Sequence, residues 1–253
     1  MARRRFFVDA VRQSHAVLEG EDARHLRQVL RAEVGQQYEI CDNQAVYLAE
    51  IEGFRKDEVL FRAIEELPVA VSPGRFTLLL ALIKFDRFEW AIEKATELGV
   101  ETIVPIETAR SEKGLERAAL KRLERWRKIA RESSQQARRS RLPEIREPAA
   151  FAAAIRDASP HRYFLDEEPG VRPLAAALPS SRSASDAVSL LVGPEGGWTD
   201  AERTAALDAG WRGVSLGPLV LRAETAAMAG LAVLANAWLA GNLVDPAVEP
   251  PLS

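Results

Sequence analysis

Leu190-Leu-Val-Gly-Pro-Glu-Gly-Gly-Trp198 is followed, 18 residues on, by Leu216-Gly-Pro-Leu-Val-Leu-Arg-Ala-Glu-Thr225, and together these segments decide the fold. Each continues an apolar, strand-like run into a loop rich in glycine and proline. Glycine permits backbone angles that other residues avoid, and it lets a ligand approach the main chain closely. Two such loops can face each other. We therefore expect them to hold a flat, polar small molecule largely by backbone groups.

Helices are expected after both loops. Thr199-Asp-Ala-Glu202 is a capping box, which predicts that a helix begins at about Asp200, and Gly210 is a stop signal for it. A second short strand is predicted over 214–216, and a long Ala-rich helix over 223–240.

The two loops match neither of the common nucleotide-binding motifs. They contain no Gly-x-Gly-x-x-Gly and no Gly-x-x-x-x-Gly-Lys-Ser/Thr, and the missing lysine argues against a triphosphate ligand. The alternative is that glycine and proline simply make tight strand-to-helix turns. Either loop alone fits this alternative equally well, whereas the pair favours a ligand site.

The chain is predicted to form two domains joined by the segment Leu67–Gly74, in which two prolines and a glycine break regular structure. We expect an N-terminal domain over 1–70, an α/β domain over 74–244, and a Pro-rich, disordered tail over 245–253. Several short strands in the first 70 residues suggest a small barrel or half-barrel. They are Phe6–Val8, Gln37–Cys41, Ala45–Ile51 and Glu58–Ile64, with a short helix over His25–Arg31.

The second domain opens with an apolar strand over 76–83, a helix over 86–98 and a strand over 102–106. A strand, a helix and a strand within about 30 residues form a βαβ unit, which implies a parallel sheet. Further strands are predicted near 162, 188 and 213. A basic helix is predicted over 115–138 and another helix over 149–158.

Composition narrows the class of protein. We expect no segment that is long and uncharged enough to span a membrane. The single cysteine, Cys41, excludes an internal disulfide, and no Cys/His cluster has metal-ligand spacing. The sequence therefore predicts a soluble cytoplasmic protein with no metal and no membrane partner.

The charge distribution is uneven. The net charge is −3, yet residues 110–147 carry 13 basic and six acidic side chains. Such a basic segment in an acidic protein is typical of phosphate contacts. The alternative is a solvated helix with ion pairs between residues four apart. Because Arg138-Arg-Ser-Arg141 is followed by Leu142-Pro143, which ends a helix, the arginines lie near a loop, and we favour a nucleic-acid role.

Taken together, these motifs resemble those of the bacterial 16S ribosomal RNA uridine-N3 methyltransferases, which belong to the SPOUT superfamily of S-adenosylmethionine enzymes. The resemblance spans about residues 3–239. In the C-terminal part it rests on Gly193–Gly197, Leu216-Gly217, Leu221–Ala226, Lys84–Arg87 with Trp90, and Lys94–Gly99. It also includes Gln136–Arg141 and, near the N-terminus, Phe6-Phe7 and His25–Arg31.

The resemblance implies a fold and an activity. The fold is a C-terminal α/β trefoil-knot domain with a parallel sheet, plus a small N-terminal PUA-like β-barrel that binds RNA. The activity is methyl transfer from S-adenosylmethionine to N3 of a uridine in 16S ribosomal RNA, free or in the small subunit. The resemblance also implies a homodimer. Small residues along the last helix would allow close helix packing, although they also suit packing against the sheet.

The resemblance and the two loops together predict the cofactor site. Adenine needs a flat apolar slot and backbone donors and acceptors. For each apolar residue, the alternative to a place in this slot is a place in the hydrophobic core. The predicted cofactor-binding residues are Leu165, Val192, Gly193, Gly197, Leu216, Gly217, Leu221 and Ala226.

Catalysis at a uridine N3 needs a group that accepts its proton and a cation or donor for the charge that spreads onto the ring carbonyls. Arg222 is the candidate cation, and Glu195 and Glu224 are the candidate bases. Alternatively, Glu224 is a negative charge that complements the dipole at the N-terminus of a helix, and Glu195 is simply an exposed residue of a turn. Alignment of the reacting atoms alone would also supply acceleration.

Arginines supply the candidate RNA contacts, since the guanidinium group binds phosphate in a bidentate manner. For Arg24, Arg27 and Arg31, the alternative is that they form the exposed face of one helix. The candidates are Arg3, Arg4, Arg5, Arg24, Arg27, Arg31, Arg110, Arg138, Arg139 and Arg141.

Four residues depart from the family pattern. Relatives commonly have Arg in place of Leu219, Thr in place of Ala223, Glu in place of Gln135 and Gly in place of Phe85. The first departure puts one RNA or substrate contact in doubt. Two other functions stay open. One is an RNA-binding module with an inactive cofactor site, which Leu219 and Ala223 favour. The other is an unrelated α/β enzyme that uses another nucleotide, which the missing phosphate-binding motifs disfavour.

Overall fold

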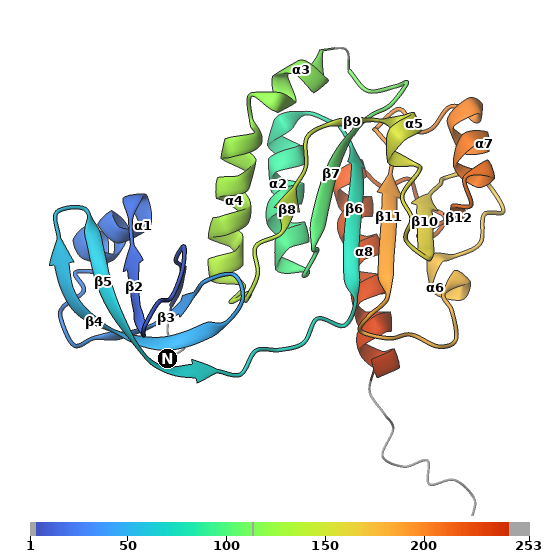
Figure 1. Cartoon of the computed structure of the whole chain (residues 1–253). Coiled ribbons are helices and arrows are strands. Elements are labelled where there is room, and N and C mark those ends of the chain that lie inside the picture. The colour runs from blue at the N-terminus through green and yellow to red at the C-terminus, as the bar shows by residue number, and fades with distance from the viewer. Residues whose placement is uncertain (1–3, 113, 243–253) are drawn as a thin grey trace, which may run out of the picture. The chain divides into compact units, whose positions relative to one another are not determined.

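The structure is a computed structural model that describes residues 4–112 and 114–242 (Figure 1). It divides into two compact units. One holds the residues up to Ala70 together with Ala130–Leu142, and the other holds Val71–Ile129 together with the residues from Pro143 onward. Segment 130–142, which the sequence places inside the second domain, thus belongs with the N-terminal residues. Arg3 and the tail over 245–253 lie outside the described residues.

The first unit is built on a five-stranded mixed sheet in the order β1-β3-β4-β5-β2. Strand β1 runs parallel to β3, and the other pairs are antiparallel. In the described residues β1 and β2 are the two edges of the sheet. The strands are β1 (Arg5–Phe7), β2 (His15–Leu18), β3 (Gln37–Cys41), β4 (Val46–Arg55) and β5 (Glu58–Leu67).

A short helical segment closes the core of the first unit. Helix α1 (Gly20–Arg24) continues into a π-helical turn, η1 (His25–Val29), so the predicted helix over 25–31 begins five residues earlier than expected. Leu26 is fully buried with Ile40 and Phe61 in the apolar cluster under the sheet. Strand β2 was missed because only two of its four residues are buried, which is too short an alternation to detect.

The second unit contains the predicted parallel sheet, with seven strands. Its main path runs β12-β10-β11-β6-β7-β8, all parallel, and β9 pairs with β7. The strands are β6 (Arg75–Ala81), β7 (Thr102–Glu107), β8 (Glu144–Ile145), β9 (Ala149–Ala150), β10 (His161–Leu165), β11 (Ala187–Val192) and β12 (Arg212–Val214).

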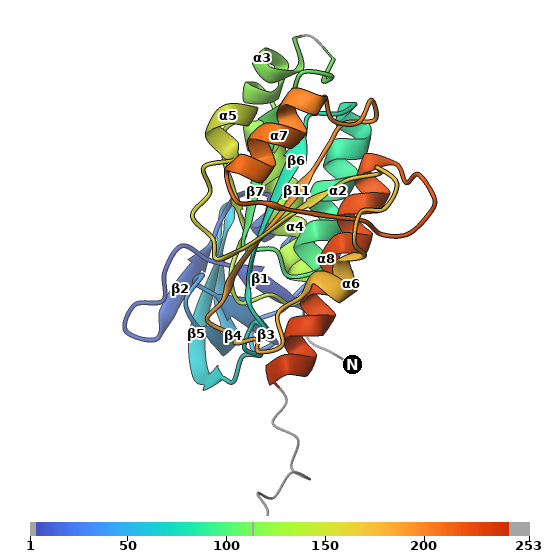
Figure 2. The same ribbon diagram turned by 90° about the vertical axis from the view of Figure 1, so that its right-hand side faces the viewer.

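Helices cover both faces of this sheet. Figure 2 shows α2 and α8 on one face and α5 and α7 on the other. Helix α8 contacts β6, β11, α2 and α6. The helices of the second unit are α2 (Phe85–Glu97), α3 (Leu115–Leu120), α5 (Phe151–Ala154), α6 (Leu174–Ala177), α7 (Asp200–Asp208) and α8 (Ala223–Asn242). Helix α4 (Leu123–Gln136) has residues in both units, because its part from Ala130 onward belongs to the first.

The capping box predicts the start of α7 correctly. The Thr199 hydroxyl accepts a hydrogen bond from the Glu202 amide, and the Glu202 carboxylate accepts one from the Thr199 amide at 2.9 Å. The helix ends at Asp208, and Gly210 has a φ of +82°, so the stop signal is also correct.

Three expected elements are wrong in their bounds. The basic helix over 115–138 is two helices, and no helix breaker marks the interruption at Lys121-Arg122. The helix over 149–158 is only α5, because Ala149 and Ala150 pair with β7 instead, and this sheet pairing outweighs the helix propensity of alanine. The strand expected over 214–216 lies earlier, at β12.

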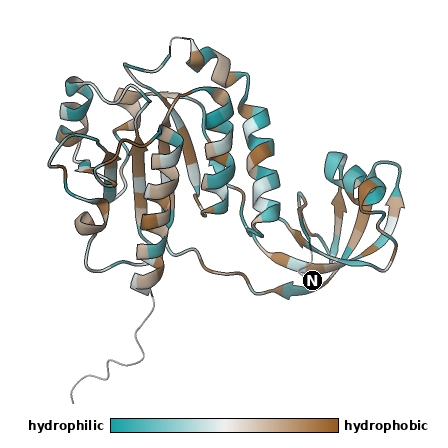
Figure 3. Ribbon diagram, turned by 180° about the vertical axis from the view of Figure 1, so that it is seen from behind, coloured by the Kyte–Doolittle hydropathy of each residue, from teal (hydrophilic) through white to brown (hydrophobic). Residues whose placement is uncertain are grey.

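Helix α8 corrects the expectation that no segment resembles a membrane span. Residues 223–241 are long and apolar enough by length and composition, and Figure 3 shows α8 largely in beige and brown. However, Ala227, Leu234 and Trp238 are fully buried, and the helix contacts β6 and β11. It therefore serves as a core helix of the second unit.

Phe85, which stands where relatives commonly have Gly, packs against two side chains of the second unit. The Arg122 guanidinium lies 4.4 Å from the Phe85 ring centroid, and the fully buried Trp126 lies 6.0 Å from it, edge to face. Phe85 thus packs the start of α2 against the start of α4.

Candidate cofactor and substrate site

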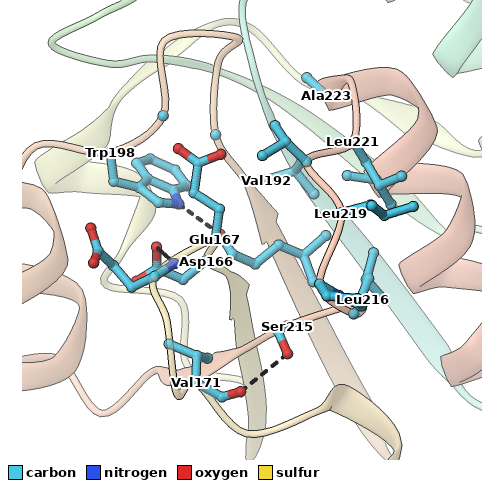
Figure 4. A pocket seen from close by; sticks show the side chains of 18 of the residues that line it. Asp166, Glu167, Val171, Val192, Trp198, Ser215, Leu216, Leu219, Leu221 and Ala223 are labelled. Atoms are coloured by element: carbon cyan, nitrogen blue, oxygen red, sulfur yellow. Dashed lines mark hydrogen bonds between the residues drawn. The ribbon is translucent and has the colours of Figure 1, made fainter.

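A cavity of about 560 Å³ opens in the second unit where β10, β11 and β12 end (Figure 4). In open α/β sheets, ligands bind outside the carboxyl ends of the strands. The loops after these strands and the start of α8 form the cavity wall. All eight predicted cofactor residues line it, namely Leu165, Val192, Gly193, Gly197, Leu216, Gly217, Leu221 and Ala226.

The wall of the cavity is largely apolar on one side. In Figure 4, Val192, Leu219 and Leu221 gather opposite the Trp198 indole. The two loops that the sequence paired therefore do face each other across one space. Apolar walls of this kind suit a flat ring system.

The glycines of the first loop have packing reasons that the sequence did not reveal. A Cβ on Gly193 would lie 2.9 Å from the Trp198 ring, and a Cβ on Gly197, where φ is +69°, would lie 2.7 Å from the Glu167 carboxylate. These two positions are filled by protein side chains. Gly217 differs, since its φ is +126° and no atom lies within 4 Å of an added Cβ. Close approach of a ligand to backbone is therefore best supported at Gly217.

Trp198 connects the loop after β11 to the end of β10. Its indole Nε1 donates to the Leu165 carbonyl at 2.8 Å, and the side chain is buried against Phe151 and Phe164. This hydrogen bond fixes the loop after β11 to the end of β10, where Leu165 lines the cavity.

Carboxylates surround the cavity. Asp166, Glu167 and Glu168 follow β10 directly and line it, as does Glu195. Arg203 of α7 pairs with Asp166 at 3.1 Å and with Glu168 at 3.2 Å. An excess of negative charge favours a cationic ligand. None of these three residues is among the candidates predicted from the sequence, although an acidic run at the carboxyl end of a parallel strand is a detectable signal.

Two of the three candidate catalytic residues share one ion-pair partner in the structure. Glu195 lines the cavity, and Glu224 is buried at the first turn of α8. Arg87, which the sequence did not single out for catalysis, lies between them, with Nη1 3.0 Å from Glu195 Oε1 and Nε 3.8 Å from Glu224 Oε1. Arg222 is exposed, and its side chain has no hydrogen bond or ion pair to any residue that the structure describes.

The structure gives two of the candidate RNA contacts internal roles in the first unit. Arg5 is buried and pairs with Glu39 at 2.8 Å, and it also donates to the Arg138 carbonyl. Arg138 pairs with the other oxygen of Glu39. Two guanidinium groups thus neutralise one buried carboxylate, an arrangement that satisfies Arg5 without a phosphate.

The other arginines are placed individually. Arg4 Nη1 lies 3.1 Å from His25 Nε2, and Arg27 donates to the Lys56 carbonyl at 2.8 Å. Arg139 donates to the Arg141 carbonyl at 3.1 Å. Arg24, Arg31 and Arg141 are exposed. A second cavity, of about 370 Å³, is lined by Arg4, Arg5, Phe6, His25, Glu132, Gln135, Gln136 and Arg138.

Arg110 is the exception among the RNA candidates, because it belongs to the second unit. Its Nη1 donates to the Gly196 carbonyl at 2.7 Å, so it supports the loop after β11.

No cluster of three or more potential metal ligands occurs among the residues that the structure describes.

Comparison with known proteins identifies the class. Residues 70–235 match the RNA methyltransferase domain family, and residues 18–64 match the RNA methyltransferase PUA domain family. The ribosomal RNA small subunit methyltransferase E of Bacillus subtilis is 30% identical over 249 residues, which cover 91% of this chain and 95% of that protein. The chain belongs to the ribosomal RNA small subunit methyltransferase E family.

Solved structures confirm the expected fold. Ribosomal RNA small subunit methyltransferase E from Neisseria gonorrhoeae, bound to S-adenosyl methionine, is 27% identical with a TM-score of 0.83 and covers 94% of this chain and 98% of its own. A protein of Legionella pneumophila in complex with the cofactor SAM is 30% identical with a TM-score of 0.84, at the same two coverages. An α/β domain with a parallel sheet and a PUA-like unit are therefore established.

Proposed function

We propose that this chain transfers the methyl group of S-adenosylmethionine to N3 of a uridine in the 16S ribosomal RNA of the small subunit, in the cytoplasm. One observation carries the proposal. A cavity with an apolar slot and a carboxylate rim lies at the ends of β10, β11 and β12, in a family whose relatives are ribosomal RNA methyltransferases. The solved relatives with SAM bound support the same cofactor.

The residues of the cavity fit S-adenosylmethionine. Leu165, Val192, Leu216 and Leu221 would enclose the adenine, and the open backbone at Gly217 would meet its polar edge. The carboxylates of the rim favour the positive charge of the sulfonium. When bound, the cofactor supplies an electrophilic methyl group.

The protein must activate the other reactant. Uridine N3 carries a proton, and its lone pair attacks only as that proton leaves. Among the residues predicted from the sequence, Glu195 and Glu224 are the candidate bases, and Arg222 is the candidate cation for the charge on the ring carbonyls. Arg222 lies on the exposed loop that leads into α8, so it would meet the uridine only when RNA covers this loop.

RNA binding is assigned to seven arginines, of which all but the half-buried Arg139 are exposed. Arg4, Arg24, Arg27, Arg31, Arg139 and Arg141 of the first unit and Arg110 beside the cofactor loop are the proposed contacts. The target uridine must be unpaired or turned out of its stack to reach the cavity.

We also propose that the active form is a homodimer. Leu219 and Val220, beside the cavity, are 78% and 79% exposed, which is unusual for two adjacent apolar side chains. The small residues of α8 support this less, because a Cβ on Gly230 would lie 2.8 Å from Leu190 of the same chain. Light scattering at micromolar concentration should give twice the mass of 27.9 kDa. A mass of one chain would contradict the dimer.

Methyl transfer to purified ribosomal subunits tests the proposed function. The protein is incubated with unmethylated small subunits, or with free 16S RNA, and labelled S-adenosylmethionine, and the modified nucleoside is mapped by mass. We expect one methyl group on N3 of one uridine. RNA binding without transfer would instead favour the module with an inactive site, which the departures at Leu219 and Ala223, both in the cavity wall, keep as the second candidate.

A further inference from the structure

Arg87 connects three elements of the second unit. It lies in the first turn of α2, and its guanidinium reaches Glu195 in the loop after β11 at 3.0 Å and Glu224 at the start of α8 at 3.8 Å. Glu195 and the neighbour of Glu224, Ala223, both line the cavity. Arg87 therefore lies immediately behind the cavity wall.

The guanidinium has donors left for a substrate. Arginine carries five N–H donors in a fixed fork. Nη1 donates to Glu195 and Nε faces Glu224, whereas Nη2 contacts no acceptor among the residues that the structure describes. The Arg87 side chain is 31% exposed, so part of it is open to an approaching substrate.

The two carboxylates differ in access. The Glu195 side chain is 40% exposed, whereas that of Glu224 is 11% exposed. Glu224 Oε2 is fully covered and has no hydrogen-bond partner within the described chain. A substrate can thus meet Glu195 directly, while Glu224 can act only through Arg87.

The charge of the cluster indicates its ligand. Two carboxylates and one guanidinium give a net charge of −1, which disfavours phosphate and suits an uncharged polar ring beside a sulfonium. The imide edge of uridine is such a ring, because it offers one N–H between two carbonyl oxygens.

We propose that Arg87, rather than Arg222, is the cation that contacts the target uridine, with Glu195 as the base and Glu224 as the residue that positions Arg87. This assignment rests on the proposed function. Arg87 Nη2 donates to a ring carbonyl oxygen and stabilises the negative charge that develops there. Glu224 holds the guanidinium from the side away from the substrate.

The proposed step is balanced. The N3–H bond breaks and its proton moves to the Glu195 carboxylate. The electron pair left on N3 forms the bond to the methyl carbon, and the pair of the breaking S–C bond stays on sulfur. The products are N3-methyluridine, a neutral thioether and protonated Glu195, so no further reactant is needed.

Single-turnover kinetics with small subunits test this assignment. Arg87→Met should lower the rate constant of methyl transfer by about 100-fold, the loss typical for one donor that stabilises developing charge. S-adenosylmethionine affinity should stay close to that of wild type. The melting temperature of Arg87→Met should fall, because the variant leaves the largely buried Glu224 without its ion-pair partner, so the rate is measured well below that temperature. Arg87→Lys keeps the charge and should recover part of both the rate and the stability. The matched control is Arg156→Met, which changes an exposed arginine at the end of α5. A rate for Arg87→Met equal to that of the control would overturn the proposal.

The roles of the two carboxylates are separated by combined variants. Glu224→Gln should slow transfer in the wild-type background and have little effect in the Arg87→Met background, because it acts through Arg87. Independent, multiplicative losses would overturn that role. Glu195→Gln should lower the single-turnover rate at fixed pH while S-adenosylmethionine affinity stays close to that of wild type, and an unchanged rate would exclude Glu195 as the base. If wild type methylates no uridine, the proposed function fails. If wild type and Arg87→Met methylate equally, only this inference fails.

Discussion

Gly193 and Gly217 show that the same residue type has two different roles in this cavity. Gly193 makes room for the Trp198 indole, whereas Gly217 adopts a φ of +126° with open space beside it. From sequence, both positions were expected to bind the cofactor for the same reason. Residue type and loop position were therefore predictable, but the side chain that fills the space at Gly193 was not, because it depends on the rotamer of a residue five positions later.

Alanine substitutions should separate these two roles. Gly193→Ala should destabilise the fold by about 1–3 kcal/mol through overpacking against Trp198. Gly217→Ala should weaken S-adenosylmethionine binding with a smaller effect on stability, because the exposed loop can relax. Thermal unfolding and calorimetric titration measure the two effects. If Gly217→Ala lowered the melting temperature more than Gly193→Ala, these roles would be wrong.

Asp186 makes stability depend on pH. The pKa of Asp186 lies below its ordinary value, mainly because the Ser183 amide donates a hydrogen bond to its carboxylate. Partial burial acts in the opposite direction, and a hydrogen bond from the Trp238 indole lowers the pKa further. A lowered pKa in the folded state stabilises the fold above the unfolded pKa of about 4, and this contribution is lost as pH falls through the folded pKa. Asp186→Asn should therefore lower stability at pH 7 and flatten its decline as the pH falls below about 4. An equal decline in wild type and variant, followed by circular dichroism, would contradict this account.

At the scale of elements, strands with long apolar runs and helices with local capping signals were the most predictable part of the chain. β11, α7 and the parallel βαβ unit β6-α2-β7 follow from apolar runs and local capping signals. The errors at α3, α4 and β9 have another origin. They depend on contacts distant in sequence, such as the pairing of Ala149 with Ile106, which no local pattern contains.

The cap of α7 provides a quantitative test at this scale. Glu202 closes the capping box and also accepts a hydrogen bond from the Ala109 amide at 2.8 Å, so it joins α7 to the segment after β7. Thr199→Ala should cost about 1 kcal/mol of unfolding free energy, as N-cap substitutions do. Glu202→Ala should cost more, because it also leaves a partly buried amide unsatisfied. Urea unfolding compares the two variants, and an equal or smaller cost for Glu202→Ala would contradict the double role.

At the scale of the whole molecule, the basic segment over 110–147 is divided between the two units. Residues 130–142 belong with the N-terminal sheet, while Arg110 supports the cofactor loop. The sequence predicted the charge but not the division, because a continuous run of arginines carries no signal of which ones face a buried carboxylate. Arg5, Arg138 and Glu39 form such a buried network.

Two arginine variants should therefore behave differently. Arg5→Gln leaves the buried Glu39 without one of its partners and should destabilise the protein by about 3–5 kcal/mol. Arg141→Gln removes an exposed charge; it should leave stability unchanged and reduce the slope of log affinity for RNA against log salt concentration by about 0.7–0.9. Filter binding at several salt concentrations and thermal unfolding give the two readouts. A reduced salt slope in folded Arg5→Gln, with normal stability, would show that Arg5 binds phosphate after all.

The most direct test of the central proposal is nucleoside analysis of 16S ribosomal RNA from cells that lack the gene. The account predicts that one 3-methyluridine disappears from this RNA, that wild-type protein restores it, and that the Arg87→Met variant restores it poorly. An unchanged content of 3-methyluridine after deletion of the gene would contradict the proposed methyl transfer to uridine N3.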